Sequence, residues 1–252
     1  MPFKRMIGVS SGAMALSFYA SDQSRHFIQI SRALVEDPKF ISYTGAWSED
    51  GMMNLRHLQR YAESHYPLNE EAIRNRLHDA DIQIVVASKE TGKAHYLHPE
   101  PGTWKRQLLA SATLPFITQG RVEINGHWMF DGGYADPIPV EQAIRCGSQD
   151  LLVIRTRPTA EPVDQSYIDW FGSWWYRDNP ALRRLFANWH VNYNRVAEML
   201  AQPAPEGLNW TQLAPPEPLA SHGYSPKNAD LDLDYRLGLE MGMEYLRELE
   251  LF

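Results

Sequence analysis

A serine flanked by small residues lies near the start of the chain, in the sequence Gly8-Val9-Ser10-Ser11-Gly12. This sequence matches the pattern G-x-S-x-G, which in hydrolases marks a sharp turn between a buried strand and a helix. Such a turn exposes the serine hydroxyl and places the N–H of the next residue at a helix N-terminus, where it can stabilise an oxyanion. The pentapeptide predicts a nucleophile at Ser10, although a tight turn with a helix-capping serine has the same letters.

A carboxylate precedes two glycines at Asp131-Gly132-Gly133, directly after the apolar stretch 127–130. Paired glycines relax the backbone, so the carboxylate can lie at a strand end in an unusual geometry. Asp-Gly is also common in ordinary turns. The motif alone therefore leaves a turn and a functional carboxylate both open.

Taken together, the two motifs and their flanks resemble the patatin-like phospholipase family. The flanks are the small-residue run 110–115, which ends in Leu-Pro, and the segment 130–140, which continues the D-G-G motif to Asp-Pro-Ile-Pro-Val. The resemblance extends over residues 3–157 and implies an α/β fold of three layers, with a mixed central sheet flanked by helices.

The resemblance also implies an activity. The chain would be a serine hydrolase that cleaves acyl esters of lipids, of the phospholipase, lysophospholipase or esterase type. Ser10 matches the nucleophile and Asp131 the base that takes its proton, so the family needs no catalytic histidine and no cofactor. A carboxylate can act in this way if close contact and desolvation raise its basicity. Water would then hydrolyse an acyl-enzyme at Ser10.

The family carries a glycine-rich loop ahead of its nucleophile, and that loop supplies most of its oxyanion hole. Only seven residues precede Gly8, and Gly132-Gly133 is the sole pair of adjacent glycines, so the sequence does not contain the loop. Losing one oxyanion donor costs about 10²–10³ in turnover. We therefore expect slow turnover, and an exposed sheet edge near residues 5–9 or an edge that a partner chain covers.

Two alternatives to the dyad stay open. A Ser-Asp-His esterase would need a histidine after Asp131 in chain order, and both His190 and His222 qualify. His190 lies among aromatic residues of an expected helix, so His222, in a polar loop, is the better candidate. The other alternative is a catalytically impaired lipid-binding or regulatory module without the oxyanion loop.

Metal and nucleotide sites have no support in the sequence. The nine histidines show no H-E-x-x-H spacing, and His95 and His98 have no acidic ligand in register, which favours an exposed pair. The single cysteine, Cys146, excludes a disulfide framework and a cysteine-based zinc site. Because no G-x-G-x-x-G occurs and no Gly-Lys-Ser/Thr follows Gly12, we expect no cofactor and no metal.

Composition narrows the class of protein. Hydrophobic residues make up 44% and charged residues 22%, as in globular proteins. The net charge of −7 argues against a nucleic-acid partner. No apolar run is long enough to span a membrane, and the N-terminus has no continuous apolar stretch like that of a secretory signal. We expect a cytoplasmic protein that acts on a lipid or acyl ester, and no oligomeric state is predicted.

Hydrophobic periodicity predicts strands and helices that interleave, as in a layered α/β fold. Strands are expected at 3–9, 82–87, 94–97, 121–124, 127–130, 151–154 and 208–213. Helices are expected at 13–19, from 24, and at 53–66, 69–77, 103–113, 164–176, 180–201 and 231–249. Asn125-Gly126 predicts a hairpin. Residues 1–252 are expected to form a single hydrolase domain, of which 160–252 is the helical C-terminal portion.

Tryptophans crowd the segment Trp170-Phe171-Gly172-Ser173-Trp174-Trp175. Packing of two helices onto the sheet would explain them, and this is the favoured interpretation. Peripheral contact with a membrane surface is the alternative, because tryptophan favours lipid–water interfaces. The acidic net charge would not help binding to anionic lipid.

Overall fold

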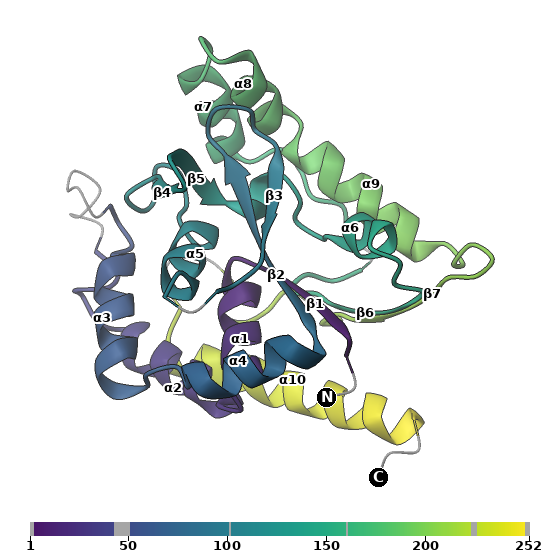
Figure 1. Cartoon of the computed structure of the whole chain (residues 1–252). Helices are drawn as coiled ribbons and strands as arrows, with labels where there is room; N and C mark the ends of the chain where they lie inside the picture. Colours follow the sequence, from purple (N-terminus) through teal and green to yellow (C-terminus); the bar gives the residue numbers. More distant parts are fainter. Residues whose placement is uncertain (1–2, 43–50, 101, 160, 223–225, 250–252) are drawn as a thin grey trace.

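The computed structural model describes residues 3–42, 51–100, 102–159, 161–222 and 226–249 (Figure 1). Its strands are β1 (Arg5–Val9), β2 (Asp81–Ser88), β3 (Ala94–Leu97), β4 (Val122–Ile124), β5 (His127–Asp131), β6 (Asp150–Ile154) and β7 (Asn209–Leu213). Its helices are α1 (Ser11–Ala20), α2 (Ser24–Leu34), α3 (Leu55–His65), α4 (Glu70–Asp79), α5 (Trp104–Ser111), α6 (Val140–Arg145), α7 (Tyr167–Trp175), α8 (Pro180–Ala187), α9 (Trp189–Ala201) and α10 (Asn228–Glu248), with a short 3₁₀ turn η2 (Gly132–Tyr134).

Strand β2 is the centre of a mixed five-stranded sheet. It pairs in parallel with β1 and antiparallel with β3 and β5, and β4 completes the predicted hairpin with β5. Val85 pairs with both β1 and β3, and Val86 pairs with both β3 and β5. Because β3 occupies one edge of β2, β1 and β5 share the other edge, end to end. Their carboxyl ends meet there.

Helices cover both faces of the sheet, which gives the three layers that the resemblance implies. Alternate side chains of a strand point to opposite faces. Ile82 and Ile84 pack beneath α1, α4 and α5, and α2 and α3 lie outside these helices (Figure 1). On the other face Gln83 contacts α6 and Ala87 contacts α8. The fold is therefore α/β with a mixed central sheet.

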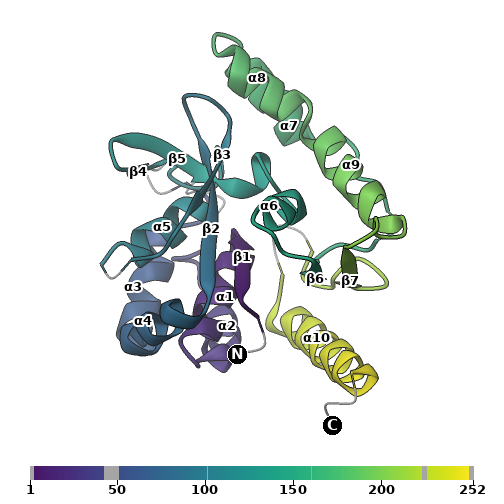
Figure 2. The same cartoon turned by 45° about the vertical axis from the view of Figure 1, so that its right-hand side comes forward.

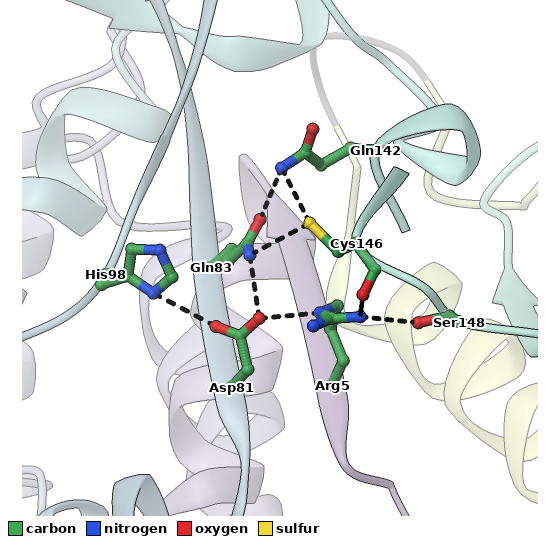
Figure 3. Close-up of polar contacts among 7 residues, drawn as sticks. All are labelled: Arg5, Asp81, Gln83, His98, Gln142, Cys146 and Ser148. Atoms are coloured by element: carbon green, nitrogen blue, oxygen red, sulfur yellow. Dashed lines mark hydrogen bonds and ion pairs between the residues drawn. The ribbon is translucent and has the colours of Figure 1, made fainter. Parts of the chain in front are cut away.

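A polar cluster explains why a glutamine occupies the buried strand β2 (Figure 3). The Gln83 side chain donates to Asp81 Oδ2 at 3.0 Å and accepts from Gln142 of α6 at 3.2 Å. Arg5 forms a salt bridge with Asp81 at 2.7 Å and donates to the carbonyl of Cys146 at 2.6 Å. These bonds satisfy a buried amide and join β1 and β2 to the segment that follows α6.

Strand β1 lies at an edge of the sheet. Within the described residues β2 is its only strand partner, so the edge position expected for residues 5–9 is found, but these residues are buried or half-buried and not exposed. Strands β6 and β7 form a separate two-stranded parallel sheet, which packs against α9 through Val153 and Tyr193.

The C-terminal helices differ from prediction at one point. A single helix was expected over 180–201, but α8 ends at Ala187 and α9 begins at Trp189, with Asn188 ending one and starting the other. At this break the Trp189 indole donates to the carbonyl of Gly133 at 2.7 Å, which ties the start of α9 to η2, directly after β5. Figure 2 shows α7, α8 and α9 along one flank, away from α10.

Helix α10 has no buried residue and is held to α2 by a salt bridge between Arg32 and Asp232 at 2.6 Å. No described helix combines the length and the apolar composition that crossing a bilayer requires.

Candidate active site

Ser10 links β1 to α1 in a strained conformation, with φ of 52° and ψ of −124°. Residues other than glycine rarely adopt positive φ, and such strain persists where the surrounding structure imposes it. The Ser10 side chain does not cap α1. Its Oγ instead donates to Oδ2 of Asp131 at 2.5 Å. The helix-capping alternative for this serine is therefore wrong.

The two glycines of the Gly8–Gly12 motif differ in what surrounds them. A Cβ on Gly8 would lie 2.6 Å from Cα of Ala13, so only glycine lets α1 pack this closely on β1. A Cβ on Gly12 would meet nothing within 4 Å. Gly8 shapes the turn, whereas the structure shows no steric need for glycine at position 12.

Asp131 is the last residue of β5 and is 3% exposed. Its Oδ1 accepts the N–H of Gly133 at 2.7 Å, which turns Oδ2 toward Ser10. Gly132 lies so close to the carbonyl of Val85 that a side chain would overlap it. Burial raises the pKa of Asp131 to about 6, against the hydrogen bonds from Ser10 and Gly133, which lower it. The carboxylate is therefore more basic than an exposed aspartate.

The meeting of β1 and β5 on one edge of β2 brings the pair together. Val9 pairs with Val85, and Asp131 pairs with the next residue of β2, Val86. Ser10 follows Val9 directly, so both side chains reach the same point of the sheet. Residues 121 positions apart in sequence thus meet through strand register.

A second serine, Ser111 at the end of α5, holds the turn at Ser10 against strand β2. Its buried hydroxyl donates to the carbonyl of Val85 at 2.7 Å and accepts the backbone N–H of Ser10 at 2.9 Å. Ser111 lies in the small-residue run 110–115, for which the sequence predicts no particular contact. Its contacts depend on tertiary structure, and the small size of residues 110–113 was the available signal.

The N-terminus of α1 offers hydrogen-bond donors beside Ser10. The N–H groups of Ser11 and Gly12 are in the first turn and have no acceptor within the helix. Within the described part of the chain, no backbone carbonyl outside the helix accepts a hydrogen bond from these two N–H groups. Together with the helix dipole, they favour negative charge at this point.

An apolar cavity of about 330 Å³ begins at Ser10 and Ser11. Helices α1, α2, α3 and α5 form its walls, and Leu231 of α10 also contributes. Along α1 it is lined by Ser11, Met14 and Phe18, which span about 10 Å at a rise of about 1.5 Å per residue. The cavity has the size and the apolar lining to hold a hydrocarbon chain next to the serine.

The two candidate histidines form no described hydrogen bond with this pair. Among the described hydrogen bonds of Ser10 and Asp131, none involves His190 or His222. His95 and His98 are both exposed, as expected for the pair, but His98 Nδ1 lies 3.1 Å from Asp81, an acidic neighbour that their spacing in sequence did not predict (Figure 3). No group of three or more potential metal ligands occurs within the described ranges.

The chain matches two protein-family models. A family model described as patatin-like phospholipase matches residues 1–144. A second model, described as a domain of unknown function (DUF6363), matches residues 179–252. The chain is also similar to the uncharacterized protein YjjU of Escherichia coli strain K12, with 26% identity over 252 residues, which covers 97% of this chain and 69% of the relative.

Proposed function

Because the chain belongs to the patatin-like phospholipase family, we propose that it hydrolyses acyl esters of lipids through a dyad of Ser10 and Asp131. The hydrogen bond of 2.5 Å from Ser10 Oγ to the buried carboxylate of Asp131 is the observation that carries this proposal. A nucleophile within hydrogen-bond reach of its base is the arrangement that acyl transfer requires.

In the proposed reaction Asp131 Oδ2 takes the Ser10 proton as Oγ attacks the ester carbonyl carbon. Protonated Asp131 then gives its proton to the departing alcohol, which leaves an acyl group on Ser10. Water, deprotonated by the same carboxylate, then attacks the acyl carbon. The bond from this carbon to Ser10 Oγ breaks, Asp131 returns the proton to Oγ, and the fatty acid is released. The raised pKa of Asp131, about 6, suits both roles, because the group can hold and release a proton near neutral pH.

The surroundings of Ser10 support the remaining requirements. The N–H groups of Ser11 and Gly12, in the first turn of α1, would be the donors that stabilise the oxyanion. The acyl chain would occupy the cavity of about 330 Å³, whose lining is mostly aliphatic and aromatic. Phospholipase, lysophospholipase and simple esterase activity all use this arrangement.

The two alternatives have less support. A triad would place a histidine beside Ser10, whereas the described partner of its hydroxyl is Asp131. A binding module would have no use for a strained serine backbone, yet Ser10 keeps a φ of 52°.

Covalent labelling tests the proposal. A fluorophosphonate probe is expected to label Ser10, and Ser10→Ala is expected to abolish labelling and the hydrolysis of p-nitrophenyl esters. Asp131→Asn is expected to slow both. Ser64→Ala, which removes an exposed hydroxyl on α3, serves as the matched control. Unchanged labelling of Ser10→Ala would disprove the role of Ser10.

A further inference from the structure

Helix α7 carries a face of large aromatic side chains that the described residues leave uncovered. Tyr167, Trp170 and Trp174 recur at i, i+3 and i+7, so they share one side of the helix, and Trp175 lies next to them. Their exposed fractions are 93%, 62%, 51% and 56%. Contiguous apolar patches of this kind are uncommon on soluble proteins unless they bind something. These four residues are called the α7 aromatic face.

Packing on the opposite side of α7 fixes the orientation of this face. Gly172 lies directly against the ring of Phe186, where any side chain would overlap. Asp169 is buried and completes a capping box with Ser166. Because the inner side of α7 is filled, the exposed rings cannot turn inward.

The indole N–H groups distinguish the exposed tryptophans from the structural ones. Trp104, Trp189 and Trp210 each donate a hydrogen bond within the fold. No such bond is found for Trp170 or Trp174 in the described part of the chain. A ring with an apolar body and an N–H that needs a polar partner satisfies both needs at a bilayer interface.

Arginines predominate on the side of the α7 aromatic face that leads into α8. The exposed charged residues from 176 to 187 are Arg177, Arg183, Arg184 and Asp178, three positive against one negative, whereas Glu161 and Asp164 are exposed ahead of the face and the whole chain carries −7. The Arg177 guanidinium lies over the Trp174 ring at 5.3 Å. This local excess of arginine complements anionic lipid headgroups, so the overall charge does not oppose lipid binding here.

The face is connected to the Ser10 cavity through the loop that follows α5. Leu114 and Ile117 line the cavity, and between them Phe116 has a φ of 69°. The Phe116 ring packs against Phe171 of α7 at 5.1 Å. A surface bound at α7 would therefore lie within one loop of the cavity wall.

We propose that the α7 aromatic face docks on the surface of a phospholipid bilayer that contains anionic lipid. The tryptophan rings enter the headgroup region and the arginines contact phosphates. Docking would bring the Ser10 cavity to the lipid surface. This advantage rests on the proposed function, but the docking itself does not require catalysis.

Vesicle sedimentation tests the proposal in the Ser10→Ala protein, which leaves the lipid intact. The protein is expected to bind vesicles of phosphatidylcholine with phosphatidylglycerol more tightly than vesicles of phosphatidylcholine alone. The double change Trp170→Ala and Trp174→Ala is expected to weaken binding about tenfold or more, the worth of burying one large apolar side chain. Arg183→Glu with Arg184→Glu is expected to remove the preference for phosphatidylglycerol.

A matched control changes exposed apolar residues elsewhere, Leu239→Ala and Met243→Ala on α10, and is expected to bind like the parent. Failure of the parent to sediment, or equal binding by the tryptophan and control variants, would overturn the proposal. A tryptophan variant that loses self-association in gel filtration and keeps vesicle binding would also overturn it, in favour of an interface between copies.

A separate measurement distinguishes docking from catalysis. With Ser10 present, the tryptophan variant is expected to hydrolyse a short soluble ester as fast as the parent and vesicle lipid more slowly. Equal loss on both substrates would contradict docking. If the parent binds vesicles but cleaves neither substrate, the proposed function fails and the docking surface stands.

Discussion

The hydroxyl of Ser111 accepts the backbone N–H of Ser10 at 2.9 Å, across 101 positions of sequence. The same hydroxyl donates to the carbonyl of Val85. Ser10 follows the last residue of β1, where the ladder to β2 ends, so Ser111 supplies hydrogen-bonding partners that the sheet no longer provides. The strained turn at Ser10 is thus held from α5.

Ser111→Ala is expected to lower kcat by about 10- to 100-fold, because a small displacement of a catalytic group costs that much. KM is expected to change little, since Ser111 does not line the cavity. Ser111→Thr, which keeps the hydroxyl, is expected to recover part of the loss. Steady-state kinetics on a p-nitrophenyl ester measure both constants.

Ser17→Ala is the control for this variant, because Ser17 is equally buried and bonds Ala13 and Trp104 away from the dyad. It is expected to lower stability by about 1–3 kcal/mol and to keep kcat. If kcat falls equally in both variants, the effect is one of stability and the positioning role of Ser111 is wrong.

The pH dependence of activity is expected to follow Asp131. The base must be ionised to take the Ser10 proton, and burial raises its pKa to about 6. In the profile of kcat/KM the activity is therefore expected to rise through about pH 6 and to be lost below it. His222→Ala is expected to leave the profile unchanged, whereas a profile that moves in this variant would favour the Ser-Asp-His esterase.

Much of this arrangement could be predicted from sequence, because it depends on local signals. Asn125-Gly126 predicts the β4–β5 hairpin, and both residues have the positive φ that such a turn requires. The break at Asn188 was missed, since no proline or glycine marks it and a distant bond from Trp189 to Gly133 holds it. The brace by Ser111 was missed for the same reason, because register between distant strands leaves no mark in local sequence.

In the aromatic segment 170–175, composition alone does not distinguish the side chains that pack inside from those that are exposed. Packing of helices explains Phe171, which contacts Phe116, whereas Trp170 and Trp174 point outward. The favoured interpretation of the tryptophans was helix packing, and for these two exposed rings it is wrong. Their orientation depends on Gly172 contacting Phe186, a contact that periodicity does not show.

Asp131→Asn is expected to change how stability depends on pH. The folded protein holds the Asp131 proton up to about pH 6, while the unfolded chain releases it near pH 4. Between these values the native state binds more protons, so this group lowers stability as pH rises. Relative to wild type, the variant is expected to gain about 3 kcal/mol between pH 4 and 7, as two pKa units imply. Urea unfolding of both proteins at a series of pH values measures this difference. The same dependence of unfolding free energy on pH in both proteins would contradict the raised pKa of Asp131.

The length of acyl chain accepted is expected to depend on Met14. Met14 lines the cavity one turn of α1 beyond Ser11, so Met14→Trp would fill the space beyond the first few carbons of a bound chain. Each buried methylene contributes about 0.8 kcal/mol, and losing about four of them would lower kcat/KM for long esters about 100-fold. Esters of acetate and butyrate are expected to be cleaved as before.

Ala15→Trp, which places the same ring on the exposed side of α1, is the control and is expected to keep the wild-type preference. A p-nitrophenyl ester series of increasing chain length compares the three proteins, and an equal loss on short and long esters would mean that the cavity does not hold the acyl chain.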